Sequence, residues 1–169
     1  MLQENGGVIM KKTVSLLIFC FAFALAAVCQ ARPLPNSEFS LGGLNVTHCT
    51  LDYASSIYGE PEYITDDGRY FQYHYGESVL LKGWRGTDGT IHINYVSTRA
   101  DNGWGTPAGL TVGMNKSVAT DLYGYESSRY DKRSGLYKTI YPHIGSGSGA
   151  GMFVYTDSQG IIQRIDVID

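Results

Sequence analysis

The chain carries one pattern of residues twice, and this self-similarity limits the fold more than any other feature of the sequence. Gly43-Leu44-Asn45-Val46 returns as Gly109-Leu110-Thr111-Val112. Each copy is followed by a Tyr-Gly pair, first Tyr58-Gly59 and then Tyr123-Gly124. Further matches follow in the same order along both halves. A series of matches in one order predicts a duplicated structural unit.

Each copy is predicted to form a short helix followed by three strands. Asn45 and Asn115 are suitable N-cap residues before segments with apolar residues at helical spacing, and a glycine follows each segment. Strands are predicted over 69–75, 78–85, 90–97, 136–142, 151–156 and 161–168, and Asp88-Gly89 and Gln159-Gly160 mark hairpin turns between the last two strands of each copy. The predicted fold class is α+β, with two tandem repeats that each pack short helices on an antiparallel β-sheet.

The first 31 residues are predicted to be a secretory signal peptide. Lys11 and Lys12 precede an apolar run from Val14 to Val28, which is shorter than the roughly 20 residues of a membrane span. We expect cleavage after Ala31, export to the periplasm or the medium, and no membrane span after cleavage. The alternative is lipidation at Cys29, since the segment before it resembles a bacterial lipobox.

The remaining chain is expected to divide into four parts. We predict a loosely ordered leader over 32–40, a first repeat over 41–97, a polar linker over 98–107 and a second repeat over 108–169. The formal net charge of −3 argues against a nucleic-acid-binding protein. Cleavage of the signal peptide leaves one cysteine, Cys49, so no internal disulfide is expected.

The repeated pattern resembles a superfamily of exported bacterial proteins that includes the beta-lactamase inhibitory proteins and the SmpA/OmlA-type outer-membrane lipoproteins. The matching residues lie in Gly43–Val46, Tyr58–Pro61, Gly109–Met114 and Tyr123-Gly124. The resemblance implies helices on an antiparallel sheet, a sheet face that grips another protein, no catalysis and no cofactor. Thr47-His48 and Tyr125-Glu126 depart from the shared pattern, and the motif contains no inhibitory residue that could be assigned here.

Other candidate motifs give weaker indications of function. Cys49 follows His48 at an expected helix start, so a thiol-dependent enzyme is a second hypothesis. His74 and His92 could approach each other across strands, but no metal-ligand spacing accompanies them and no metal site is predicted. The glycine-rich segment 145–151 precedes a strand and lacks the lysine of a phosphate-binding loop, so we interpret it as a hairpin loop.

The alternation of side chains along the strands yields the main candidate site. Phe71, Tyr73, Tyr95 and Ile140 are expected to face the helices. The opposite face would then carry a set of aromatic and histidine side chains: Tyr70, His74, Trp84, Tyr137, Tyr141, Phe153 and Tyr155. An exposed aromatic face is typical of a protein contact surface.

We therefore predict an exported, non-enzymatic module that docks another protein on this face, with Lys82 and Arg85 at its rim. Inhibition of a secreted enzyme would be a special case of this function. A structural or assembly role in the cell envelope is the alternative.

Overall fold

The computed structural model describes residues 32–66, 70–144 and 149–169. The described residues belong to one compact unit, which ends at Asp169. The predicted signal peptide, its cleavage site and the lipidation at Cys29 lie outside the described residues, as does most of the predicted loop over 145–151. Within the described ranges, none of the helices has the length and apolar character needed to cross a bilayer.

The described elements are mostly strands, arranged around two α-helices. The helical segments are η1 (Asn36–Glu38), α2 (Leu51–Tyr58) and α3 (Lys116–Tyr123). The strands before α3 are β1 (Ser40–Leu41), β2 (Leu44–Asn45), β3 (Tyr63–Asp66), β4 (Tyr70–Tyr75), β5 (Val79–Arg85) and β6 (Ile91–Thr98). Those after α3 are β7 (Ser128–Asp131), β8 (Leu136–Pro142), β9 (Gly151–Thr156) and β10 (Ile162–Ile168).

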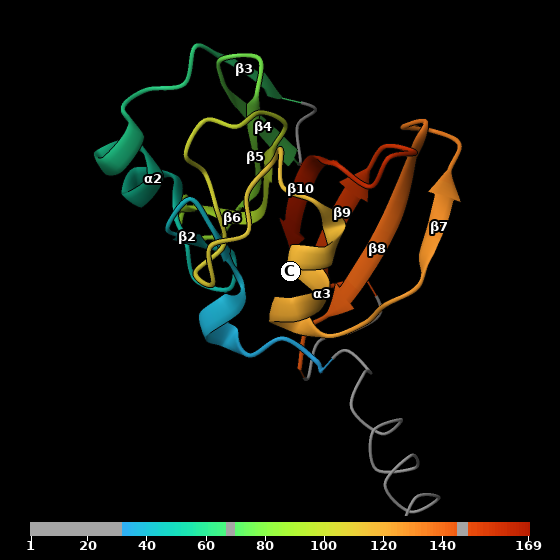
Figure 1. The fold of residues 1–169 in the computed structure, drawn as a ribbon. Helices are drawn as coiled ribbons and strands as arrows, with labels where there is room; N and C mark the ends of the chain where they lie inside the picture. Colours follow the sequence, from blue (N-terminus) through green and yellow to red (C-terminus); the bar gives the residue numbers. More distant parts are fainter. Residues whose placement is uncertain (1–31, 67–69, 145–148) are drawn as a thin grey trace, which may run out of the picture. The chain divides into compact units, whose positions relative to one another are not determined.

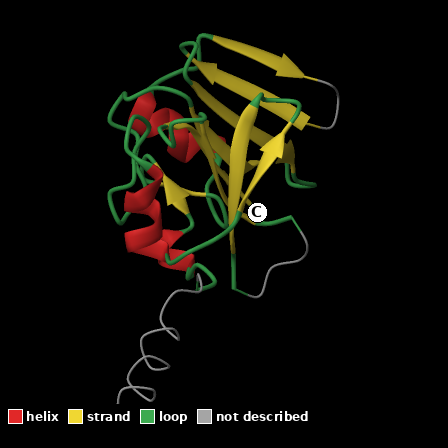
Figure 2. Cartoon of the chain, turned by 45° about the vertical axis from the view of Figure 1, so that its right-hand side comes forward, coloured by secondary structure: helices red, strands yellow, loops and turns green. Residues whose placement is uncertain are grey.

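One antiparallel sheet contains eight of these described strands, in the order β3-β4-β5-β6-β10-β9-β8-β7 (Figure 1). The two hydrogen-bonded halves meet where β10 pairs with β6 in the middle of the sheet. Both described α-helices lie on the same side of the sheet (Figure 2). The predicted fold class, α+β with an antiparallel sheet, is confirmed.

The helix-facing side of the sheet contains the hydrophobic core. Ala54 of α2 and Ala119 of α3 are both fully buried, and their small side chains let the helices approach the sheet closely. Leu81, Val96 and Val154 are among the strand residues buried beneath them. Full burial of one aliphatic side chain contributes about 1.5–3 kcal/mol, so this layer is the main source of stability.

The helix ends follow from local sequence, although one predicted start is wrong. Asn115 caps α3, because its Oδ1 accepts a hydrogen bond from Ser117 N at 3.0 Å. In the first half Thr50, not Asn45, caps the helix: its side chain accepts from Tyr53 N at 3.3 Å. Asn45 instead closes a turn, in which its Oδ1 accepts a hydrogen bond from Thr47 N at 3.0 Å. A cap-type residue can close a turn as readily as a helix.

The predicted loose leader over 32–40 is wrong, because this segment is part of the core. Leu34 and Phe39 are 2% and 0% exposed. Leu34 N donates to Pro142 O at 2.7 Å, which attaches the segment beside the end of β8. The Phe39 ring stacks on His143 at 4.1 Å between centroids. Two large apolar side chains buried by nearby strands fix a segment whose own regular structure is limited to η1 and the first residue of β1.

The linker predicted over 98–107 is likewise held in place by packing. Trp104 stacks against Tyr58 of α2 at 4.4 Å and covers Gly42 in the β1–β2 turn. A Cβ at Gly42 would lie 2.3 Å from the Trp104 ring, and Gly42 also has a φ of +59°. Two independent constraints therefore require glycine at this position: the lack of space for a Cβ and the positive φ.

Candidate functional site

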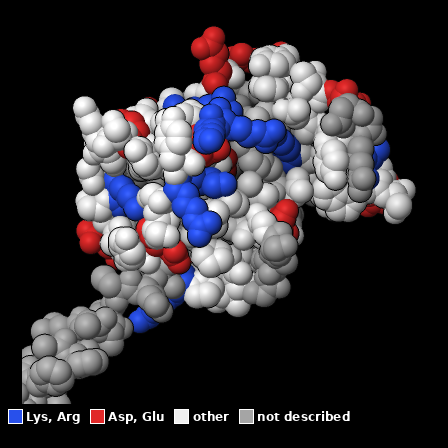
Figure 3. Space-filling view, turned by 90° about the vertical axis from the view of Figure 1, so that its right-hand side faces the viewer, with Lys and Arg blue, Asp and Glu red and all other residues white. Residues whose placement is uncertain are grey.

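The side of the sheet that faces away from the helices, here called the open face, is the candidate site. Along β4 and β5, alternate residues such as Phe71, Tyr73 and Leu81 point into the core, so Tyr70, His74 and their neighbours point away from it. In the space-filling view this face is hollowed, and Lys and Arg side chains gather across the hollow with an acidic group among them (Figure 3).

An aromatic group lies at one end of the open face. Tyr70 and Trp84 are cross-strand partners on β4 and β5, and both are 42% exposed. Trp84 also stacks on His92 of β6, with 4.8 Å between ring centroids. A surface hollow of about 460 Å³ is lined by Tyr70 and Trp84 together with Asn94 and Arg85. Large aromatic rings that stay this exposed leave apolar area for a partner to cover.

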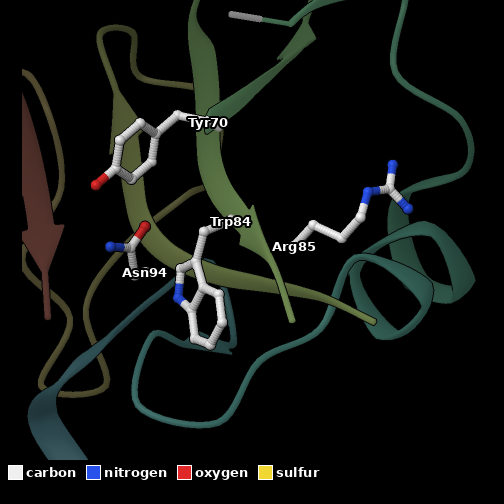
Figure 4. A pocket seen from close by; sticks show the side chains of 4 residues that line it. All are labelled: Tyr70, Trp84, Arg85 and Asn94. Atoms are coloured by element: carbon white, nitrogen blue, oxygen red, sulfur yellow. The ribbon is translucent and has the colours of Figure 1, made fainter. Parts of the chain in front are cut away.

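The close-up shows how these four residues are oriented (Figure 4). Tyr70, Trp84 and Asn94 lie on one side of the strands, whereas Arg85 points the other way. The Arg85 guanidinium lies 4.9 Å from the centroid of Phe71, a core-facing ring. Arg85 therefore borders the hollow, as expected of a rim residue, but its side chain is directed to the other face, since consecutive strand residues point to opposite faces.

A bulge gives the hollow its shape. The register shifts between β5 and β6, where Lys82 pairs with Tyr95 but Gly83 pairs with Ile93, so Asn94 is the extra residue. A Cβ at Gly83 would lie 2.6 Å from the carbonyl oxygen of His92, so only glycine permits this close approach. The bulge also turns Tyr95 to the open face, contrary to the prediction that it faces the helices.

His74 lies on the open face, as predicted, but in a ring pair rather than a metal site. It stacks on Tyr63 of β3 with 4.0 Å between ring centroids. Burial lowers the pKa of His74, and the nearby Arg99 and Lys82 lower it further. His92 lies two strands away on β6 and four positions further along the β5 register, which separates the two histidine backbones by roughly 16 Å. In the described residues no three His, Cys, Asp or Glu side chains are grouped to hold a metal ion.

Phe153 and Tyr155 also lie on the open face but are only 8% and 7% exposed. Long cationic side chains cover them: the Arg164 guanidinium is 3.5 Å from the Tyr155 ring centroid, and Lys138 Nζ is 5.4 Å from that of Phe153. These two rings are therefore a floor beneath charged groups, and they are not exposed anchors. Cation–π contacts of this kind hold the charges in defined positions.

A buried carboxylate lies at the centre of the open face. Asp166 of β10 is 2% exposed, accepts from Ser97 Oγ at 2.7 Å and lies 3.2 Å from Arg164 Nε. Burial raises the pKa of Asp166, although Arg164 and Ser97 act in the opposite direction. Burial also raises the pKa of neighbouring Tyr95 to about 12, with Asp166 adding to the rise. This network joins β6 to β10 at the middle of the sheet.

Tyr141 and Tyr137 lie on the helix face, so their prediction as open-face residues is wrong. Tyr141 is 0% exposed and its ring lies 5.5 Å from that of Tyr123 in α3. Tyr137 shares that face, although it is 41% exposed at the sheet's end beside Tyr130. Ile140, predicted to face the helices, instead points outward and is 41% exposed. A shift of one residue in the assumed register reverses every side chain of a strand.

The environment of Cys49 is the opposite of that of an activated thiol. The side chain is buried, and burial raises its pKa to about 11. Its Sγ donates to the carbonyl oxygen of Thr50 at 3.4 Å. Adjacent His48 is exposed and its Nδ1 lies 3.0 Å from Thr47 Oγ1. A thiol nucleophile needs a lowered pKa and access to solvent, and this geometry provides neither.

Sequence reasoning missed the cationic side chains that cover the open face. Lys138 and Arg129 occupy cross-strand positions on β8 and β7, and Arg164 precedes the core residue Ile165 on β10. Alternation places Lys138 only once the facing of β8 is known: because Thr139 and Tyr141 are buried on the helix side, Lys138 points outward.

No family profile matches the sequence, and no curated protein sequence matches it. The solved structures to which the chain is similar include the following two. A DUF4309 family protein, YjgB from Bacillus subtilis subsp. subtilis str. 168, is 14% identical at a TM-score of 0.45, over 75% of this chain and 82% of that one. A cysteine-rich secretory protein, SAV1118 from Staphylococcus aureus subsp. aureus Mu50, is 13% identical at a TM-score of 0.46, over 81% of this chain and 50% of that one. Neither likeness indicates a function.

Proposed function

We propose that this protein is an exported, non-enzymatic binding module that docks another protein on the open face. The observation that carries the proposal is the exposed Tyr70–Trp84 pair beside the hollow, on the side of the sheet away from the helices. Tyr and Trp are the residues that most often anchor protein interfaces, because they bury a large area at little cost in side-chain entropy. A strand platform also presents them rigidly, so little order is lost on binding.

We further infer that the platform consists of two tandem repeats. Helices α2 and α3 both have eight residues, with a buried Ala at the fourth position and Tyr at the eighth. A glycine with positive φ follows each, Gly59 at +77° and Gly124 at +89°. From each edge of the sheet to the β6–β10 junction the strands also follow chain order: β3-β4-β5-β6 on one side and β7-β8-β9-β10 on the other. Duplication of one α–β unit explains these agreements economically.

The hairpins before each helix support the same inference. Leu44 and Leu110 are 0% exposed, and Val46 and Val112 are 3% and 7% exposed, so the repeated Gly-Leu-x-Val pattern supplies core residues in both halves. The terminal tyrosine of each helix bonds back to its own hairpin region: Tyr58 Oη donates to Gly42 O, and Tyr123 Oη lies 2.6 Å from Thr106 Oγ1. In both halves, the tyrosine of the Tyr-Gly pair thus attaches the end of its helix to the hairpin region before it.

The proposed location is the periplasm or the medium of a bacterium, on the basis of Lys11, Lys12 and the apolar run after them. The repeated Gly-Leu-x-Val and Tyr-Gly pattern resembles that of the beta-lactamase inhibitory and SmpA/OmlA-type proteins, and an inhibitor-like role would be a special case of docking. A cell-envelope assembly role remains the alternative, and it is distinguished by lipid labelling that is lost on Cys29→Ser.

Partner capture tests the proposal. The purified protein is used as bait on an extract of the parent cell envelope, and the Trp84→Ala/Tyr70→Ala variant should lose at least about 90% of the captured partner, because two central anchors typically contribute 2 kcal/mol or more each. Tyr53→Ala/Tyr125→Ala is the matched control, since these residues are 51% and 56% exposed and lie outside the open face. Equal capture by all three proteins would contradict docking at this site.

A further inference from the structure

A row of cationic side chains crosses one end of the open face. Lys138 of β8 pairs across the strands with Arg129 of β7 and with Tyr155 of β9, and Tyr155 pairs with Arg164 of β10. Arg99 follows the last residue of β6 and continues the line beside Arg164. We call Arg99, Arg164, Lys138 and Arg129 the cationic row. With strands about 4.8 Å apart, it spans roughly 19 Å.

The charge of the cationic row is poorly balanced by the protein itself. Arg164 forms an ion pair with buried Asp166, and no ion pair with Arg99, Lys138 or Arg129 is found among the described residues. At the edge of the row, Asp131 accepts hydrogen bonds from Ser134 Oγ at 2.8 Å and Arg133 N at 3.1 Å within its own turn. Lys138 also contributes to the lowered pKa of Asp131, so this carboxylate balances part of the charge at that edge. Like charges on neighbouring strands destabilise a sheet. An anion bound across the row would relieve this repulsion.

The surroundings make the same end of the face electropositive. Lys82 Nζ lies 4.9 Å from the centroid of Tyr95, which places a fifth cation on the open face. Arg99 and Lys82 both lower the pKa of His74, so their positive field reaches the β4 side of the face. The protein as a whole has a formal net charge of −3. The positive charge is thus a local feature of one face.

We propose that the cationic row binds an acidic segment of the protein partner, an inference that rests on the proposed docking at the open face. Rows of Lys and Arg favour carboxylates through charge-assisted hydrogen bonds. Next to the row, the open face also offers apolar area, including Ile140 at 41% exposure. This area suits a peptide that carries apolar side chains between Asp or Glu residues. A net negative protein has little long-range attraction for a nucleic acid or an anionic membrane, so a short acidic segment is the better match.

Fluorescence anisotropy with a synthetic peptide tests the inference. The probe is a fluorescein-labelled peptide of about eight residues that alternates Glu with Leu, which is long enough to span the row at about 3.3 Å per residue. The purified protein should bind it, and the affinity should fall steeply as salt concentration rises, because exposed charges are screened within about 8–10 Å. A peptide with Gln in place of Glu should bind at least about tenfold more weakly.

Matched variants identify the binding residues. Lys138→Gln/Arg129→Gln should weaken binding of the Glu peptide about tenfold, because two charge-assisted contacts are lost. Arg32→Gln/Lys132→Gln removes the same charge from exposed positions outside the row and should bind as the wild type does. The inference is overturned if both double variants bind equally, or if polyphosphate or anionic phospholipid vesicles bind the row in preference to the peptide.

The two proposals fail in different ways. Suppose that Lys138→Gln/Arg129→Gln captures the cellular partner as well as the wild type does, while Trp84→Ala/Tyr70→Ala still loses it. Docking at the open face then stands, and the inference that the cationic row binds an acidic segment is wrong. If neither variant loses the partner, docking at this face is itself wrong. Circular dichroism of both variants confirms that each remains folded, since all four side chains are at least partly exposed.

Discussion

At the scale of single residues, two aromatic side chains of the sheet have opposite roles. Trp84 is 42% exposed beside the hollow, whereas Tyr141 is 0% exposed between the sheet and α3. Truncation of Tyr141 would leave a cavity in the core, so Tyr141→Ala should lower the free energy of unfolding by about 3–5 kcal/mol. Trp84→Ala should cost about 1 kcal/mol or less, because its ring keeps much of its contact with water in the folded state.

Urea denaturation of the two single variants checks this difference. The midpoint should move strongly for Tyr141→Ala and little for Trp84→Ala. A comparable loss in both variants would mean that Trp84 supports the core, and it would remove the main reason to regard it as a binding anchor.

Asp166 should make the stability of the protein depend on pH. Its pKa is raised above the ordinary value of 3.8, chiefly by burial. The folded state therefore holds this proton more tightly than the unfolded state does. The contribution of the group to the free energy of unfolding is complete below about pH 3.8 and is lost as the pH rises through the folded-state pKa.

Asp166→Asn removes this titration, so it gives a direct measurement. The free energy of unfolding of the wild type minus that of the variant should be larger at about pH 4 than at about pH 7. Urea titrations at both pH values provide the two differences. A difference that grows toward neutral pH would mean that the ion pair with Arg164 outweighs the cost of burial.

Cys49 should react slowly with thiol reagents in the folded protein. Its pKa is raised to about 11 by burial, so almost none of it is thiolate at neutral pH. A Cys20→Ser/Cys29→Ser variant leaves Cys49 as the one thiol. Iodoacetamide should modify it at least about a hundredfold more slowly without urea than with it. Rapid modification of the folded variant would revive the thiol-enzyme hypothesis.

At the scale of elements, the β1–β2 turn holds the connection between the two halves. Gly42 lies under Trp104, and its amide N–H donates to Gly105 O at 3.0 Å. Gly42→Ala should lower the free energy of unfolding by about 2–4 kcal/mol, because it adds a clash to an unfavourable φ. Gly43→Ala is the control: its φ is +77° but nothing lies within 4 Å of the new Cβ.

The control variant should cost only about 1 kcal/mol, the strain of the backbone alone. Thermal unfolding of both variants, with a fall in midpoint several degrees larger for Gly42→Ala, checks the packing of Trp104. Equal effects would mean that the linker moves aside readily.

The strands show what periodicity can and cannot predict. All six predicted strands agree with β4, β5, β6, β8, β9 and β10 to within one residue at either end, because their apolar residues alternate between turn signals. Strands β3 and β7 were not predicted; each has four residues, and no residue of either is buried. A short strand at a sheet edge has no buried face to impose a pattern.

The facing of side chains was harder to predict than the strands themselves. The prediction put Ile140 on the helix side of β8 and Tyr137 and Tyr141 on the opposite side, whereas the pairing of Tyr141 with buried Met152 puts both tyrosines on the helix side. That one-residue slip put Tyr141 on the wrong face and hid Lys138. The bulge at Asn94 did the same to Tyr95. Neither irregularity leaves a signal in hydrophobic alternation.

At the scale of the whole described unit, charge and apolar character are separated by the sheet. One face packs against the helices and contains the core, while the other carries exposed rings at one end and the cationic row at another. The β6–β10 pair joins the two halves, with Asp166 and Ser97 bonded across it. A continuous sheet that turns one face away from the helices is well suited to holding a partner.

Site-specific photo-crosslinking in the parent cell tests the central claim, that a protein docks on the open face, most directly. A benzoyl-phenylalanine residue replaces Trp84 in one strain and Tyr125, which lies outside this face, in another. Irradiation should give one discrete crosslinked protein from position 84 and none from position 125. The same adduct from both positions, or no adduct from position 84, would contradict the proposal.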